Sequence, residues 1–153
     1  MRRKDREMPS EWALEILDKA PFVTVSFARP DGSPYGVPLS LAHTDEKTFY
    51  FHCAMEGYKV DALKACDKAC FTVIDQPVQE PGNWWYHVRS VVCFGRISFV
   101  EDAEEHLSKL RMIDNKYFPE SHDMEGDIQK NGPRTVILDL RIEHMTGKRV
   151  KEN

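Results

Sequence analysis

Hydrophobic and polar residues alternate along residues 22–28 and 135–145, and four further stretches are strand-like runs of apolar, aromatic or β-branched residues, so the sequence predicts six β-strands. Successive side chains of a strand point to opposite faces of a sheet, so the alternation indicates a sheet with one buried face. The predicted strands span residues 22–28, 35–42, 48–54, 69–75, 85–100 and 135–145. In the last strand we expect Val136, Leu138, Leu140 and Ile142 to share one face.

Glycine and proline residues mark the turns and irregular points of these strands. Pro30-Asp31-Gly32-Ser33 is a strong turn signal between the first two strands, and residues 44–47 form the next turn. Pro38 lies within the second strand, where a proline indicates an edge strand, a bulge or a break that faces a cofactor. Gly95 predicts a bend in the long fifth strand.

Apolar residues recur at helical spacing in three places. The first helix has Ser10 as its predicted N-cap and ends before Pro21. A short second helix covers 59–66, directly after the third strand. The apolar face of the first helix is formed by Trp12, Ala13, Ile16, Leu17 and Ala20.

The third helix begins at Asp102 and runs to about Phe118. Asp102 and Glu105 have the spacing of a capping box, with Asp in place of Ser or Thr. We expect this helix to bury Leu107, Leu110 and either Ile113 or Met112. The segment 119–133 that follows is polar and is predicted to be irregular, with room for a short helical turn.

The order of these elements predicts a mainly β protein with some α (α+β). Hairpins, one short helix, more hairpins, a longer helix and a final strand follow each other, without the regular βαβ spacing of a doubly wound parallel sheet. An antiparallel barrel with peripheral helices removes the exposed edges of such a sheet. We therefore expect one domain over residues 1–153, with a six-stranded antiparallel barrel.

Composition and charge narrow the range of functions. The 25 acidic and 21 basic side chains give a formal net charge of -4, which argues against nucleic-acid binding. No apolar run approaches the ~20 residues of a transmembrane helix, and no signal peptide is evident, so we expect a cytoplasmic protein without membrane contact. The cysteines lack zinc-site spacing, so we expect reduced structural thiols and no metal; they are Cys53, Cys66, Cys70 and Cys93.

The segment 49–59 contains the most informative candidate chemistry. A strand-like run ends at Gly57, and a helical pattern then begins with Lys59 near its start. A helix N-terminus favours anions such as phosphate, and the lysine adds a full charge. His52 exchanges protons near neutral pH, so one stretch could hold a phosphate and place a proton donor nearby. The alternatives are a solvated helix lysine and a structural histidine.

Several motifs together resemble one known family. The chain is similar to the FMN-binding split barrels related to pyridoxamine 5'-phosphate oxidase, and within them to the nitroimidazole-resistance (Nim-like) branch. The order and spacing of the motifs carry this resemblance over almost the whole chain. The motifs lie at residues 1–7, 35–40, 51–59, 90–95 and 142–148.

The resemblance implies a homodimer with FMN in a groove at the subunit interface. It implies that backbone groups of the second strand bond the edge of the flavin ring, that Lys59 meets the phosphate, and that Ser90 and the Trp84-Trp85 region serve the partner's site. It makes His52 the first candidate for proton donor or substrate anchor. The implied cofactor-binding residues are Val37, Pro38, Leu39, Ser40, Phe51, His52, Cys53, Tyr58, Lys59 and Ser90.

The implied activity is an FMN-dependent oxidoreductase that reduces a small, electron-poor, nitroaromatic-like substrate. No dinucleotide-binding motif is present, so NAD(P)H would bind transiently at the flavin. Tyr58 stands where many relatives have His, and Arg141 and His144 do not match the substrate pair of true pyridoxamine phosphate oxidases. The alternatives are a flavin-binding protein without turnover and a haem-binding split barrel with His52 or His144 as ligand.

Overall fold

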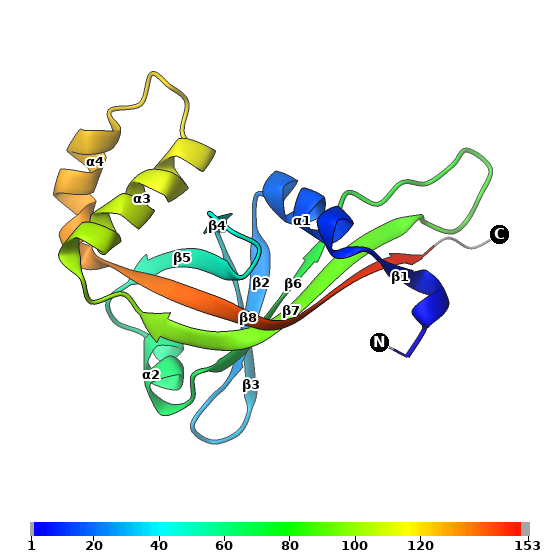
Figure 1. Cartoon of the computed structure of the whole chain (residues 1–153), viewed down its shortest axis with the longest axis horizontal. Coiled ribbons are helices and arrows are strands. Elements are labelled where there is room, and N and C mark those ends of the chain that lie inside the picture. The colour runs from blue at the N-terminus through cyan, green and yellow to red at the C-terminus, as the bar shows by residue number, and fades with distance from the viewer. Residues whose placement is uncertain (1, 151–153) are drawn as a thin grey trace.

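One antiparallel sheet of eight strands forms the body of the molecule (Figure 1). The computed structural model describes residues 2–150; residue 1 of the first motif and residues 151–153 of the expected domain lie outside this range. The strand order is β3-β2-β6-β7-β8-β5-β4, with β1 paired to β8. The strands are β1 (Glu7–Met8), β2 (Val23–Ala28), β3 (Pro34–Leu39), β4 (Ala42–His43), β5 (Thr48–Ala54), β6 (Lys68–Ile74), β7 (Val88–Phe99) and β8 (Thr135–Val150).

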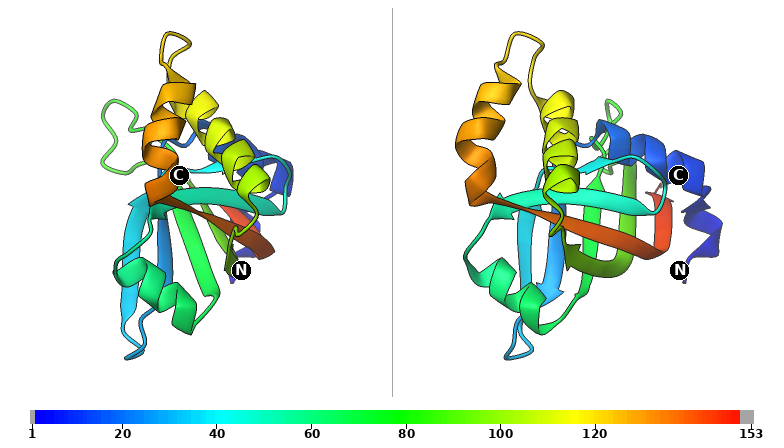
Figure 2. Two further views of the ribbon diagram at one scale, coloured as in Figure 1. Left: turned by 90° about the vertical axis from the view of Figure 1, so that its left-hand side faces the viewer. Right: turned by 60° about the vertical axis from the view of Figure 1, so that its left-hand side comes forward.

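The sheet curls into a barrel that remains split (Figure 2). Strands β3 and β4 are the two ends of the strand order, and β3 contacts β5 without a hydrogen-bonded ladder joining them among the described residues. All six predicted strands are present, one of them divided into β3 and β4, and the two-residue strand β1 is added to them. The predicted α+β split barrel with peripheral helices is therefore confirmed.

The concave side of the sheet holds the main hydrophobic core. Phe71 packs edge-on against Phe49 and Phe51, with ring centroids 5.3 Å and 5.9 Å apart, and all three are fully buried. Leu138 and Leu140 of β8 join them as predicted. Helix α1 (Ser10–Lys19) adds its buried apolar face to this core. Aromatic pairs of this geometry add specificity to the area that they bury.

Four helices surround the sheet in the described residues, and one of them was not predicted as a full helix. Besides α1 these are α2 (Tyr58–Ala65), α3 (Ala103–Tyr117) and α4 (Met124–Asn131), with 3-10 turns at Lys4–Arg6 and Gly132–Arg134. Helix α4 lies inside the segment that we expected to be irregular. Asp123 caps it by accepting a hydrogen bond from the Gly126 amide at 3.1 Å.

The caps of the other helices were predicted in part. Asp102 accepts from the Glu105 amide at 2.8 Å, so α3 begins where the sequence indicated. The prediction for Ser10 was wrong by one position, because Pro9 is the cap residue and Ser10 is already helical. Leu107 was also misplaced: it is 38% exposed, because it lies on the outward side of α3, whereas Leu110 and Ile113 are buried.

Strand ends differ from the predictions where side chains compete for backbone groups. The predicted strand 35–42 divides into β3 and β4, because the Leu41 amide donates to the Tyr117 hydroxyl at 2.8 Å and that hydroxyl donates to the Leu41 carbonyl at 2.9 Å. Strand β7 begins at Val88, so Trp84 and Trp85 lie outside it and pack against each other. Strand β8 continues to Val150.

Helices α3 and α4 form a hairpin that covers the outer side of β5 (Figures 1 and 2). A second, smaller hydrophobic cluster lies between this hairpin and the sheet. It consists of Ala42, Tyr50, Leu110, Ile113, Ile128 and Ile137. The hairpin is therefore a separate layer above the barrel, and the space beneath it is bounded by β5.

The bend predicted at Gly95 coincides with a shift of register between β7 and β8. The shift occurs between Phe94 and Gly95, and a Cβ atom on Gly95 would lie 2.1 Å from the Arg141 carbonyl oxygen. We expect Gly95→Ala to lower the free energy of unfolding by about 2–3 kcal/mol, because backbone cannot yield to the added methyl group. Urea denaturation measures this loss.

Gly36→Ala is the matched control, because its Cβ would meet the Ser26 side chain at 3.4 Å, an ordinary contact. We expect this variant to be as stable as the wild type or slightly more so. Equal stabilities of the Gly95 and Gly36 variants would show that the close approach at Gly95 does not constrain the sheet.

Candidate functional site

Strand β5 presents two chemically different faces. Phe51 and Cys53 point into the barrel core, with 0% and 7% of their surfaces exposed. Tyr50 and His52 point the other way, toward the α3–α4 hairpin. Any contact of Phe51 with a ligand would thus come from its backbone, whereas the His52 side chain is available.

A cavity of about 450 Å³ lies between β5 and the α3–α4 hairpin. Its volume is in the range of small-molecule sites. Ser40 and His52 reach it from the sheet, and α3, α4 and the chain before β2 supply the remaining walls. Its lining consists of Phe22, Ser40, His52, Leu110, Ile113, Asp114, Tyr117, Phe118, Asp127, Ile128, Asn131, Gly132 and Thr135.

His52 is held as a neutral imidazole in the wall of this cavity. Its Nδ1 atom is buried and has no hydrogen-bond partner within residues 2–150. Burial lowers the pKa of His52 below its ordinary value, and the negative charge of Asp114 opposes this only in part. A neutral imidazole both donates and accepts a hydrogen bond, so His52 can exchange a proton with a ligand in the cavity.

Asp114 of α3 is the most unusual polar group of the cavity. It is 8% exposed, and its carboxylate has no hydrogen bond or ion pair within the described part of the chain. Burial raises the pKa of Asp114, and the charge of Asp127 adds to this, while His52 and His122 act in the opposite direction. A buried carboxylate without a partner is costly, which is typical of a functional position.

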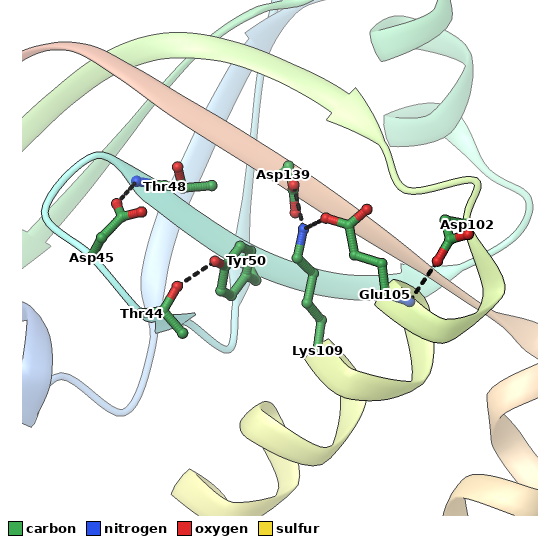
Figure 3. Close-up of polar contacts among 8 residues, drawn as sticks. All are labelled: Thr44, Asp45, Thr48, Tyr50, Asp102, Glu105, Lys109 and Asp139. Atoms are coloured by element: carbon green, nitrogen blue, oxygen red, sulfur yellow. Dashed lines mark hydrogen bonds and ion pairs between the residues drawn. The ribbon is translucent and has the colours of Figure 1, made fainter.

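Lys109 fixes α3 on the sheet beside this cavity (Figure 3). Its ammonium group donates to Glu105 and to Asp139 of β8, both at 2.5 Å, and lies 4.5 Å from the centre of the Tyr50 ring. Burial acts to lower the pKa of Lys109, but the hydrogen bonds to Asp139 and Glu105 outweigh it and raise that pKa. The Tyr50 hydroxyl in turn bonds the Thr44 hydroxyl at 2.5 Å.

The start of α2 has the features expected of a phosphate site. Gly57 precedes the helix with φ 126°, a conformation that favours glycine, and no Cβ would be accommodated there without strain. Lys59 is half-buried, and its side chain has no hydrogen-bond or ion-pair partner in the described range. Tyr58 is 70% exposed, with the Arg29 guanidinium 5.4 Å from its ring centre.

The remaining predicted cofactor residues lie on β3 and β7. Val37 is half-buried, Pro38 exposed and Leu39 buried, and Ser40 directly after them lines the cavity. Strand β3 is an end of the strand order, so Pro38 is an edge-strand proline. Ser90 is half-buried on β7, opposite Ile74 and Lys148, and is not part of the cavity wall.

Sequence reasoning missed the residues that α3 and α4 contribute to the cavity. Asp127 and Asn131 come from the helix that was not predicted. A sequence signal for this helix was present. Met124 and Ile128 are apolar residues at helical spacing, and Asp123 directly before them is a suitable N-cap. Asp114 was missed because a lone acid in a helix usually faces solvent.

Comparison with known proteins agrees with the fold and the motifs. The family model described as pyridoxamine 5'-phosphate oxidase matches residues 9–149. The chain belongs to this family. No match was found among curated proteins.

Solved structures of the pyridoxamine 5'-phosphate oxidase fold superimpose on the chain. A candidate 5-nitroimidazole antibiotic resistance protein from Bacteroides thetaiotaomicron is 22% identical, with 95% of this chain and 90% of that one covered and a TM-score of 0.76. An FAD-binding protein from Mesorhizobium loti is 21% identical, with 95% of this chain and 98% of that one covered and a TM-score of 0.68.

An FAD- and haem-binding protein from Mycobacterium smegmatis is 19% identical to the chain, with 96% of this chain and 74% of that one covered and a TM-score of 0.74. At such identities these likenesses concern the fold. In the described residues, no group of three metal-binding side chains occurs, and no helix is long and apolar enough to cross a membrane.

We expect Lys109→Met to lower the free energy of unfolding by about 2–3 kcal/mol at pH 7, because it leaves the Asp139 carboxylate poorly compensated near the sheet. Burial already raises the pKa of Asp139, and removal of the ammonium raises it further. The loss of stability in the variant therefore becomes smaller as the pH falls through the raised pKa of Asp139, because the protonated carboxyl no longer needs the ammonium group. Denaturation curves at several pH values measure it.

Lys19→Met is the control for this prediction. Lys19 pairs with Glu15 at 2.6 Å, but both side chains are more than half exposed, so little change is expected. If both lysine variants lose the same small amount of stability, the ion pair of Lys109 with Asp139 does not hold α3 on the sheet.

Proposed function

We propose that the chain is a flavin-dependent oxidoreductase that holds FMN between β3, β5 and the start of α2 and reduces a small electron-poor aromatic substrate. One arrangement carries this proposal. A neutral His52 faces a cavity from β5, and the same strand leads through Gly57 to an unpaired Lys59 at a helix start. Similar folds bind FAD in the proteins named above.

The residues present fit this cofactor. Lys59 and the helix N-terminus would hold the phosphate, and the backbone of Val37 to Ser40 would bond the edge of the ring. FMN, when bound, supplies the electron transfer. The α3–α4 hairpin would cover the substrate, and the His52 imidazole, which lines the cavity, would hold or donate a proton.

A homodimer is part of this proposal, since the resemblance places the flavin between two subunits. Phe94 and Ile74 are 48% and 64% exposed on the sheet, and Trp84 is 78% exposed in the loop before β7. Large apolar side chains in such positions are suited to a partner subunit. NAD(P)H is the proposed electron donor, bound transiently at the flavin.

Two other functions remain as alternatives with distinct spectra and kinetics. A flavin-binding protein without turnover would retain FMN but would not be reduced rapidly by NAD(P)H. Haem binding would give a Soret band, and a fold of this kind binds haem together with FAD in the mycobacterial protein. His144 is exposed and stacks on Phe94, and it does not line the cavity. His52 is therefore the better-placed of the two histidines to ligate a haem iron.

We expect the purified protein to retain FMN after desalting, with a perturbed visible spectrum. Lys59→Ala should weaken FMN binding by about 10- to 100-fold, the value of a hydrogen bond to a charged group. Lys64→Ala is the matched control, because Lys64 is an exposed lysine in the last turn of the same helix. Fluorescence titration with FMN compares the three proteins.

An unchanged affinity of the Lys59 variant would remove this residue from the site. A wild-type protein that retains no FMN would contradict the proposed function as a whole.

We expect His52→Ala to retain flavin but to reduce kcat with a nitroaromatic acceptor by about 100-fold, because general acid catalysis is lost. Flavin reduction by NAD(P)H should be little affected, so stopped-flow measurement of the two half-reactions separates the role of His52. His144→Ala serves as the control, since His144 lies on the exposed side of β8. Wild-type kcat in the His52 variant would exclude a catalytic role.

A further inference from the structure

The charged side chains that line the cavity under the α3–α4 hairpin are all acidic. Asp114 and Asp127 are the charged side chains of its lining, and neither lysine nor arginine contributes to it. Lys116 lies two residues after Asp114 on α3, but its ammonium group donates to the Leu17 carbonyl at 3.3 Å and thus contacts α1. An anion placed in this cavity would meet carboxylates and find no cation among the lining residues.

The two carboxylates differ in what they already bind. Asp127 accepts a hydrogen bond from the Asn131 amide at 2.7 Å, so it has a partner. Asp114 is more than nine-tenths buried, lines the cavity and has no side-chain partner within residues 2–150. His52 and His122 influence it through charge, but neither ring hydrogen-bonds to it, and His52 Nδ1 and His122 Nε2 have no partner within residues 2–150. Asp114 is therefore an acceptor without a donor.

The Asp114 carboxylate is free to accept a hydrogen bond from a molecule in the cavity. A carboxylate in a cavity meets fewer water donors than one on the open surface, so a ligand donor that replaces them strengthens binding. A ligand with an ammonium, amidinium or ring N–H group would supply the missing donor. His52 also lines the cavity, and its imidazole gives the cavity a second polar group.

The rest of the lining is suited to a flat apolar ring. Leu110, Ile113 and Ile128 form one wall, and the aromatic rings of Phe22 and Tyr117 stack with centroids 6.4 Å apart. The two hydrogen bonds of the Tyr117 hydroxyl to Leu41 fix the position of its ring. A volume of about 450 Å³ accommodates a molecule of one or two rings.

We propose that this cavity is a subsite for a small aromatic or heteroaromatic molecule with a cationic or N–H donor group, which binds Asp114 while the ring packs against Tyr117 and Ile113. Molecules that carry a carboxylate or phosphate are disfavoured there. The identification of this molecule as the substrate rests on the proposed flavin function, whereas the charge preference of the cavity does not.

A set of three probes of equal size and different charge tests the proposal. Benzylamine, benzyl alcohol and benzoate are titrated at pH 7 into the full-length protein, and binding is followed by amide shifts in two-dimensional NMR spectra. We expect benzylamine to bind at least 10-fold more tightly than benzoate, with the largest shifts on α3, α4 and β5. This comparison needs no variant, so it does not depend on the folding of one.

Asp114→Asn keeps the shape of the side chain and removes its charge. We expect it to weaken benzylamine binding about 10-fold and to leave benzyl alcohol unchanged, since one charge-assisted hydrogen bond is lost. Glu104→Gln is the matched control: Glu104 is an exposed acid in the first turn of α3 and should affect none of the probes.

Several outcomes would overturn the proposal. These are benzoate binding as tightly as benzylamine, no measurable binding of any probe, shifts confined to other surfaces, or equal effects of the Asp114 and Glu104 variants. Failure of the flavin function is a separate result. A protein that retains no FMN but still prefers benzylamine keeps the subsite, whereas one that retains FMN without this preference loses the subsite alone.

Discussion

The pairing of β7 with β8 is the constraint on which the rest of the structure depends. The two longest strands run together from Val88↔Val150 to Phe99↔Leu138, and the close approach of Gly95 to the Arg141 carbonyl allows the pair to bend. Strand β8 also pairs with β1 and β5, and β7 with β6, so this pair joins the β3-β2-β6 part of the sheet to the β5-β4 part. A bent pair curls the sheet, and its concave side then encloses the aromatic core.

The second level of organisation is the attachment of α3 to the convex side. Lys109 ties the helix to Asp139 of β8 and lies over the Tyr50 ring of β5 (Figure 3). The Tyr117 hydroxyl holds the C-terminal end of the helix through Leu41. Both contacts adjoin the apolar cluster that α3 shares with α4, since Tyr50 belongs to this cluster and Tyr117 packs against it. They fix the middle and the C-terminal end of the helix, and Asp114 between them is kept in a buried position that hydrophobic packing alone would not favour.

The two chemical regions of the molecule have opposite character. The start of α2 offers a lysine and a helix N-terminus, which favour an anion. The cavity under the hairpin offers carboxylates, a neutral imidazole and apolar walls, which favour a donor-bearing ring. His52 lies on β5 and Lys59 at the start of α2, the next element along the chain, so a cofactor phosphate and a substrate of different charge could occupy neighbouring sites without competing for the same groups.

The sequence by itself determined the six main strands, the antiparallel order, helix α3 with its Asp102 cap, and the family, because period, capping and motif spacing are local signals. It also singled out His52 and Lys59. Only the tertiary structure decided that Leu41 leaves the sheet for Tyr117, that α4 closes a cavity, and that Asp114 is buried opposite His52. These features arise from contacts between segments far apart in the chain, and the pattern around one residue does not show which distant side chain will bury it.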